Sequence, residues 1–254
     1  MCSVEKRGNV YILTLTGNDE HRLNPTLITS IRSSLSQIKS QALKSKTSSS
    51  ALITTAHGKF FSNGYDLNWA NSSPNPAISK ELVESQLKAL ISELFSFPMP
   101  TIAAVTGHAS AAGFILAMAH DYVVMRKERG FLYMSEVDIG LVIPPWFMAM
   151  MRCKIGGGWE GWRRVALMGE KVTAEKGKRE IGVVYEVFEG AEGTVEGAVE
   201  LGEKLVKRGW DGVVYGEIRK GLLKEVFDLI SNNDILYDAN HGVNVKATVI
   251  RPRL

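Results

Sequence analysis

The chain has 254 residues, of which 45% are hydrophobic and 22% are charged, a composition that excludes collagen-like and low-complexity classes. Its length suits one large α/β domain, or one domain with a small addition. The net charge of +3 comes without a long basic run, and the longest apolar runs are about half a membrane span, so the composition favours neither nucleic-acid binding nor a membrane-spanning segment.

The first part of the chain alternates between strand-like and helix-like stretches. Residues 10–16 are rich in β-branched and aromatic side chains, which is typical of a strand. Asn24 followed by Pro25 is a typical helix start, and apolar residues then recur at helical spacing. We predict strands at 10–16, 51–56, 101–106, 122–126, 131–134 and 183–188, helices from 25, at 82–97 and at 113–119, and loops at 40–50 and 68–79.

The composition changes after about residue 190. Residues 192–208 and 215–230 have helical periodicity and no strand pattern, so we predict an all-helical C-terminal region. The predicted fold class is therefore α/β, with a core at 1–190 and a helical region at 191–254.

Two glycine-containing segments could present the backbone to a ligand. The first, 57–67, is a tight turn directly after a predicted strand. The second, 101–119, runs from a strand through small residues, including Ala111, Ala112 and Gly113, into a helix. Small side chains let a ligand approach the unpaired N–H groups of a helix N-terminus, but they equally let a helix pack tightly on a sheet.

A third segment, 131–145, contains a candidate catalytic base. Glu136 follows a predicted buried strand and has apolar neighbours such as Met134 and Ile139. An apolar setting raises the pKa of a carboxyl group, which suits a group that accepts and returns a proton. The alternative is an exposed loop acid that pairs with a lysine.

Together, the three segments resemble the crotonase (enoyl-CoA hydratase/isomerase) superfamily. FSNGYDL at 61–67 is similar to its F-x-x-G-x-D-L/I turn. GHASAAG at 107–113 is similar to its G-x-A-x-G-G-G turn, with alanine at two glycine positions. Ser135 and Glu136, followed by Gly140, are similar to its P-E-x-x-x-G segment. The resemblance covers roughly residues 10–190.

The resemblance implies a crotonase-like ββα spiral core whose helical C-terminal region forms homotrimers or homohexamers. It also implies a fatty enoyl-CoA substrate, whose thioester oxygen would lie between the amide N–H groups of Tyr65 and Ala112. Ala111 must then adopt a backbone conformation that the family gives to glycine. No cofactor is implied, since coenzyme A is part of the substrate. The expected substrate-binding residues are Ser62, Asn63, Gly64, Asp66, Leu67, Ala111, Gly113, Ile115, Pro144 and Trp146.

The carboxylates distinguish between the reactions of the family. Its hydratases use two glutamates, and Ile115 occupies the position of one of them, two residues after Gly113. Glu136 occupies the position of the other. A single base that moves a proton from C2 to C4 needs no second carboxylate, so the pattern resembles the Δ3,Δ2-enoyl-CoA isomerases. Pro144 and Trp146 are similar to the P-x-W stretch that follows the catalytic glutamate in those enzymes.

Other activities remain as alternatives. EVDIGL at 136–141 also resembles the dienoyl-CoA isomerases, but Pro144 stands where they carry a second acid, and Asp138 is more typical of an exposed or capping residue. An enoyl-CoA hydratase and a non-catalytic acyl-CoA-binding protein of the same fold are further alternatives. No nucleophile accompanies His57 or His108 as in a hydrolytic triad, and no metal site is indicated.

The ends of the chain and its cysteines bear on location. The N-terminal residues lack the apolar stretch of a secretory signal, and two cysteines are too few for a disulfide framework. The terminal Pro252, Arg253 and Leu254 resemble the Ser-Lys-Leu type of peroxisomal address, which an import receptor reads. We therefore expect a peroxisomal protein, most similar to the plant peroxisomal Δ3,Δ2-enoyl-CoA isomerases.

Overall fold

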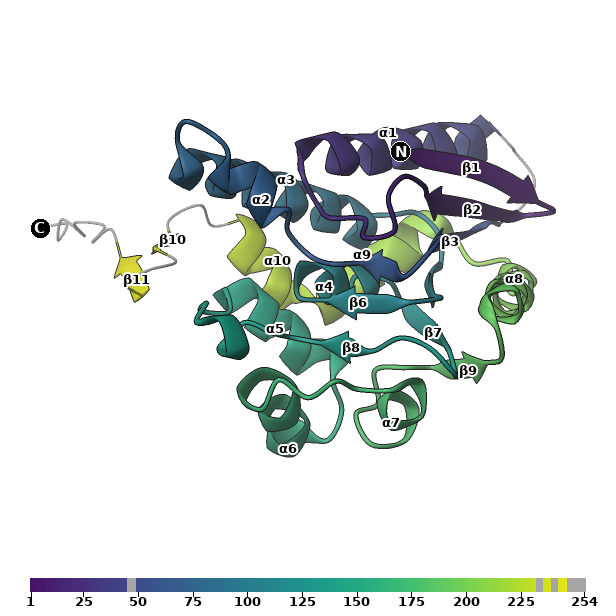
Figure 1. The fold of residues 1–254 in the computed structure, drawn as a ribbon. Helices are drawn as coiled ribbons and strands as arrows, with labels where there is room; N and C mark the ends of the chain where they lie inside the picture. Colours follow the sequence, from purple (N-terminus) through teal and green to yellow (C-terminus); the bar gives the residue numbers. More distant parts are fainter. Residues whose placement is uncertain (45–48, 232–234, 239–241, 246–254) are drawn as a thin grey trace, which may run out of the picture.

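The main sheet has six strands in the order β1-β2-β3-β5-β7-β9 (Figure 1). The computed structural model describes residues 1–44, 49–231, 235–238 and 242–245. Strand β1 is antiparallel to β2, and the other neighbours are parallel. The strands are β1 (Cys2–Arg7), β2 (Val10–Leu15), β3 (Ala51–Ala56), β5 (Thr101–Val105), β7 (Tyr122–Arg126) and β9 (Glu186–Phe188).

Both faces of this sheet are covered, which explains its nearly continuous apolar strands. In β2, Val10 and Ile12 belong to the core that includes residues of α8 (Ala191–Val206), whereas Tyr11 and Leu13 belong to the larger core on the other face. The larger core also contains α1 (Pro25–Lys44), α3 (Pro76–Phe95) and α4 (Ala112–Met118). Alternate side chains of one strand thus enter two different cores.

A second, smaller sheet lies beside the larger core. Its order is β4-β6-β8, and both pairs of neighbours are parallel. The strands are β4 (Phe60–Ser62), β6 (His108–Ser110) and β8 (Leu132–Tyr133). Their parallel direction brings the three carboxyl ends to the same edge of the sheet, where the candidate site lies.

The remaining elements are short helices and one hairpin. In the described part of the chain, no helix is long and apolar enough to cross a membrane. These elements are α2 (Leu67–Asn71), a 3₁₀ turn (Val137–Ile139), α5 (Pro145–Lys154), α6 (Gly158–Trp162), a π-helical turn (Arg163–Leu167), α7 (Ala174–Arg179), α9 (Gly212–Leu222), α10 (Lys224–Ser231), β10 (Ile235–Asp238) and β11 (Gly242–Val245).

The predicted strands and the helix at 113–119 are confirmed, with bounds that differ by a few residues. The predicted loop at 68–79 is wrong, because α2 and the start of α3 occupy most of it. Asp66 and Asn75 cap these helices, and Pro76 occupies the first turn of α3, so polar residues that suggested a loop are helix starts. The predicted loop at 40–50 is wrong for residues 40–44, because α1 continues to Lys44. The predicted helices at 192–208 and 215–230 are confirmed as α8 and as α9 with α10, but the tail is not helical throughout, because β10 and β11 form an antiparallel pair.

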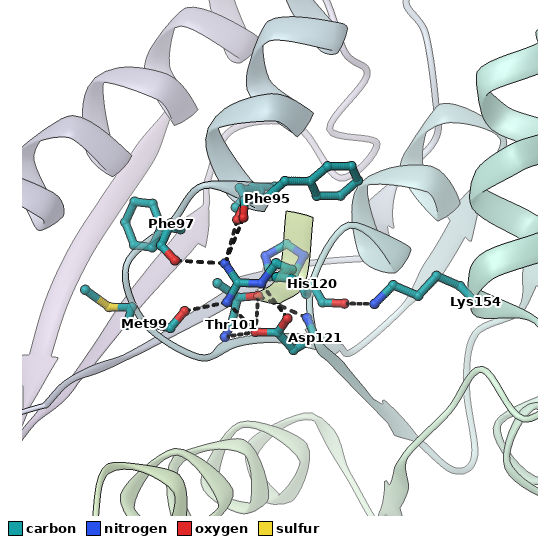
Figure 2. Close-up of polar contacts among 9 residues, drawn as sticks. Phe95, Phe97, Met99, Thr101, His120, Asp121 and Lys154 are labelled. Carbon is teal, nitrogen blue, oxygen red and sulfur yellow. Dashed lines mark hydrogen bonds and ion pairs between the residues drawn. The ribbon is translucent and has the colours of Figure 1, made fainter. Parts of the chain in front are cut away.

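A buried arginine connects α9 to the main sheet. Arg219 donates from Nε and Nη2 to the two carboxylate oxygens of Asp121, both at 2.6 Å. It also donates to the carbonyl oxygens of Leu94, near the end of α3, and of Phe97 and Met99, in the segment that follows α3. Figure 2 shows the carbonyl groups of Phe97 and Met99 and the side chain of Asp121 converging on this guanidinium. Asp121 and the end of α3 are therefore fixed by one side chain.

His120, next to Asp121, is also held on both sides. Its Nδ1 donates to the carbonyl oxygen of Leu116 (2.9 Å), and its Nε2 accepts from the hydroxyl of Thr54 (2.8 Å). Burial lowers the pKa of His120 to about 4, so the ring is neutral at pH 7. These contacts give His120 and Asp121 a structural role at the turn between α4 and β7.

Candidate active site

The small sheet brings the three predicted site segments together. The turn at 63–66 follows β4, Ala111 and Ala112 follow β6, and Glu136 follows β8 by three residues. Since β6 is the central strand, its end lies between the other two. Segments separated by about 70 residues in the sequence therefore form one site.

The turn after β4 directs the amide of Tyr65 away from its neighbouring segment. Leu23 donates from N to the carbonyl oxygen of Gly64 (2.7 Å), and Asp66 donates from N to the carbonyl oxygen of Leu23 (3.0 Å). In this parallel bridge, the N–H of the intervening residue, Tyr65, points to the opposite side. Gly64 has φ +72°, and a Cβ built on it would lie 3.5 Å from Ala112 N, so the two segments touch.

Ala112 is the first residue of α4, where an amide N–H has no acceptor within the helix. Ala111, just before it, has φ +51° and ψ −124°, a conformation that favours glycine. Its amide donates to Tyr133 O (2.9 Å), and its own carbonyl accepts from Ile115 N (3.1 Å). Ala111 therefore adopts the backbone conformation that the resemblance requires, at the cost of strain.

Gly113 allows α4 to approach β4. A Cβ built on Gly113 would lie 2.2 Å from the carbonyl oxygen of Ser62, so no larger residue fits without movement. The hydroxyl of Ser62 donates to the carbonyl oxygen of His21 (2.8 Å), and Ser62 is fully buried. This packing fixes the distance between the turn of Tyr65 and the start of α4.

Glu136 supplies a carboxylate in an apolar setting. The residue is 6% exposed, and its Oε2 is buried with no hydrogen-bond partner among the described residues. Burial raises the pKa of Glu136, although amide N–H groups of residues 135 and 136 partly offset the effect. Leu141 donates from N to the carbonyl oxygen of Glu136 (2.9 Å), which holds the loop that carries it. The exposed-acid alternative does not fit this burial.

Aromatic side chains and one further acid line the same region. The ring of Tyr65 lies 6.2 Å from that of Phe147, which in turn meets Trp146 edge-on at 4.3 Å. Trp146 donates from Nε1 to Glu84 on α3 (3.2 Å), and Glu84 also pairs with Lys88 (3.1 Å). The hydroxyl of Tyr65 is buried without a partner among the described residues.

Several residues predicted to bind substrate support the turns through their side chains. Asp66 accepts from Trp69 N and from Asn24 Nδ2, both at 3.0 Å, and thereby caps α2 and joins it to the start of α1. Asn63 donates from N to Glu20 O (2.8 Å). Ile115 is fully buried in the larger core. Leu67 begins α2, and Pro144 precedes α5 at its N-cap position.

Glu84 is the residue near the site that the sequence did not indicate. Its spacing of four residues from Lys88 is typical of a solvated ion pair on a helix. Its contact with Trp146 joins α3 to α5 across 62 residues of sequence, so no local pattern could reveal it.

The fold and this arrangement of turns define the class of protein. Residues 5–215 match the family model described as enoyl-CoA hydratase/isomerase, and the chain belongs to that family. The predicted family and fold class are thereby confirmed. A probable enoyl-CoA hydratase from Mycobacterium tuberculosis, 20% identical, has the same fold, with a TM-score of 0.77 over 90% of this chain and 91% of the other.

The curated relatives are more specific. The chain is 55% identical to enoyl-CoA delta isomerase 1, peroxisomal, of Arabidopsis thaliana, over 89% of this chain and 91% of the relative. It is 49% identical to enoyl-CoA delta isomerase 3 of the same plant, over 92% of this chain and 98% of the relative. It is also 49% identical to enoyl-CoA delta isomerase 2, peroxisomal, over 91% and 95% of the two chains.

Proposed function

We propose that the protein is a Δ3,Δ2-enoyl-CoA isomerase, which moves a double bond of an unsaturated fatty acyl-CoA from C3 to C2 during β-oxidation. The observation that carries this proposal is one buried carboxylate, Glu136, beside two main-chain donor positions, with Ile115 in the core where a hydratase needs its second acid. The identity of 49% to 55% with three enoyl-CoA delta isomerases supports it.

The proposed mechanism uses one side chain and two amides. The thioester oxygen of a 3-enoyl-CoA accepts hydrogen bonds from the N–H groups of Tyr65 and Ala112. Glu136 removes a proton from C2, and the electron pair moves through the dienolate onto the thioester oxygen. The protonated Glu136 then delivers the proton to C4, the double bond forms between C2 and C3, and the carboxylate is regenerated.

The local chemistry suits each step. Two fixed donors stabilise charge that is greatest on the dienolate oxygen, and each is typically worth about 10² to 10³ in rate. The raised pKa of Glu136 brings its proton affinity closer to the working pH, which favours a group that both takes and returns a proton. No redox step or metal enters the scheme, and coenzyme A belongs to the substrate. Phe147 packs against the ring of Tyr65 and Trp146 packs against Phe147, and both side chains are buried (1% and 2% exposed).

The test is conversion of 3-hexenoyl-CoA, followed by ultraviolet absorbance. We expect Glu136→Gln to lose at least about 10³-fold in kcat with an unchanged circular dichroism spectrum. Asp138→Asn is the matched control, because Asp138 is an exposed acid two residues away, and it should keep normal activity. Near-normal turnover by Glu136→Gln would contradict the mechanism.

The same assays separate the alternatives. Loss of activity in Asp138→Asn, together with conversion of 3,5-dienoyl-CoA, would favour a dienoyl-CoA isomerase. Addition of water to a 2-enoyl-CoA would favour a hydratase. Acyl-CoA binding without any conversion would favour a non-catalytic binding protein.

We propose in addition that the region 191–254, which follows the core of 1–190, mediates assembly into homotrimers or homohexamers. The support is an apolar stripe on α9, where Val214, Ile218 and Leu222 are 56%, 60% and 77% exposed at a spacing of four residues. Light scattering after size exclusion should give three or six times the 27.9 kDa chain mass, and Ile218→Glu should lower it. A monomeric wild-type protein would contradict this.

We further propose a peroxisomal location, supported by the names of two relatives, both called peroxisomal. The proposed address, Pro252, Arg253 and Leu254, lies outside the described residues. Its partner would be the peroxisomal import receptor. A fluorescent fusion with a free C-terminus should enter peroxisomes, and removal of the three residues should leave it in the cytosol. Unchanged import would contradict the address.

A further inference from the structure

The loop that carries Glu136 is held mainly by its two ends. In the described part of the chain, the hydrogen bonds of 137–141 all stay within 135–141, as does the one from Leu141 N to Glu136 O (2.9 Å). Most side chains from 137 to 142 are exposed, so packing adds little. The position of the base therefore depends on β8, which precedes the loop, and on α5, which follows it.

Two prolines make the connection between the loop and α5 stiff. Pro144 lies at the N-cap position of α5 with an extended backbone (φ −58°, ψ 145°), and Pro145 is the first residue of the helix. Because the proline ring fixes φ, little rotation is possible between the loop and the helix. A shift at the start of α5 is therefore passed on to the loop.

A side chain of α3 holds the start of α5 in place. Trp146, the second residue of α5, donates from Nε1 to Oε1 of Glu84 (3.2 Å). The indole is buried and meets the ring of Phe147 edge-on at 4.3 Å. A buried indole N–H usually has a hydrogen-bond partner, and Glu84 supplies it. This contact fixes the first turn of α5 against a helix that lies about 60 residues earlier in the chain.

We propose that Glu84 is a positioning residue for the base, because it fixes Trp146 and thereby the loop of Glu136. The proposal rests on the assignment of Glu136 as the base in the proposed function. Glu84 also has an ordinary role, since Nζ of Lys88 lies 3.1 Å from the same carboxylate oxygen. Ion pairs at this spacing on a helix contribute little to stability, so variants can separate the two roles.

Two variants of Glu84 test the proposal. Glu84→Leu removes the acceptor, and we expect kcat for 3-hexenoyl-CoA to fall about 10-fold, because a misplaced base reacts more slowly. KM should stay within about twofold, since the proposed donors to the thioester oxygen are unchanged. Glu84→Gln keeps an oxygen that accepts from Trp146, so its kcat should stay within about threefold of wild type.

A double variant shows whether Glu84 acts through Trp146. Trp146→Phe removes the donor, and in this background Glu84→Leu should lower kcat no further. A residue whose charge acted directly on the substrate would lower kcat equally in both backgrounds. Lys88→Gln is the matched control, because it breaks the ion pair and leaves the contact with Trp146, and it should keep normal kcat.

Three results would overturn the proposal. These are a normal kcat in folded Glu84→Leu, an equal loss of kcat in Glu84→Gln, and an equal effect of Glu84→Leu in both backgrounds. A lower melting temperature with unchanged kcat would likewise assign Glu84 a structural role only. Circular dichroism checks the fold of each variant. Since Glu84 is partly exposed, the contrast between its two variants still decides if Trp146→Phe does not fold.

The result also stays distinct from the test of the proposed function. If Glu136→Gln is inactive and Glu84→Leu behaves as wild type, the base stands and only the role of Glu84 is wrong. If Glu136→Gln is active, the base is wrong and the inference falls with it.

Discussion

The carbonyl oxygen of Ser62 lies against Gly113, so closely that a Cβ on Gly113 would stand 2.2 Å from it. The contact joins the end of β4 to the first turn of α4. Because the proposed donors, Tyr65 and Ala112, lie just beyond these two ends, the same contact sets their separation.

Gly113→Ala should therefore damage both stability and catalysis. The methyl group must displace main chain rather than a flexible side chain, and such overpacking costs about 1 to 3 kcal/mol. Urea unfolding should show this loss, and kcat should fall by at least about 10-fold. Gly193→Ala is a control in α8, where a new Cβ meets nothing within 4 Å. Equal stability of the two variants would contradict the argument.

The strained backbone at Ala111 leads to a second prediction. Its φ of +51° costs a residue with a Cβ about 1 to 3 kcal/mol, and glycine avoids most of this cost. After allowance for the greater freedom of glycine in the unfolded chain, Ala111→Gly should stabilise the protein by about 1 kcal/mol. Ala117→Gly, in the last turn of α4, should instead lose about 1 kcal/mol. If Ala111→Gly lowers the free energy of unfolding in urea, the positive φ of Ala111 is not a source of strain in the folded protein.

The contacts of Arg219 predict a large and specific loss of stability. Arg219→Met leaves Asp121 and three carbonyl groups without their partner in a buried setting, which typically costs about 3 to 5 kcal/mol. Arg219→Lys should recover little, because an ammonium group cannot reproduce the planar fork. Arg152→Met breaks an exposed pair with Glu225 and should cost less than about 1 kcal/mol. Similar unfolding midpoints for Arg219→Met and Arg152→Met would contradict the assignment.

His120 predicts a pH dependence of stability. Its pKa is about 4 in the folded protein and about 6.5 when unfolded, so between these values the unfolded chain binds the extra proton. Stability from this residue is therefore complete above pH 6.5 and falls by about 3 kcal/mol as the pH approaches 4. His120→Asn removes this contribution, so the difference between wild type and variant should shrink as the pH falls through that range. A constant difference would contradict the shift.

Local sequence patterns predicted the helices and strands that carry a clear signal in their own residues, such as an apolar run or a capping residue. The apolar strands and the helix start at Asn24 have strong local signals, and the structure contains them. Strand β1 was missed because its charged residues form an exposed edge that pairs only with β2. Strands β4 and β6 have three residues each, which is too short for any periodicity. They exist because they pair with one another across long separations.

The features of the candidate site also fall into two groups, those visible in the local sequence and those that depend on long-range packing. Motifs located Gly64, Ala111 and Glu136, because a turn or a buried acid after a strand is visible in the sequence. The burial of Glu136 and the positive φ of Ala111 result from packing. From the sequence they were only conditions that the proposed site must meet, and the structure shows both. The contact of Glu84 with Trp146 depends on how α3 and α5 meet, and no local pattern encodes that meeting.

The proposed donors at residues 65 and 112 are main-chain N–H groups, so every amino acid except proline brings an N–H to each of these positions. The fold of the backbone therefore supplies the hydrogen-bond donors of such a site, and most substitutions at these two positions leave the donors in place. Mutations can then change the other part of the site, which consists of the acidic and apolar side chains around the reacting carbons. A single scaffold can in this way acquire a different reaction by a few point substitutions while its machinery for stabilising an enolate stays in place.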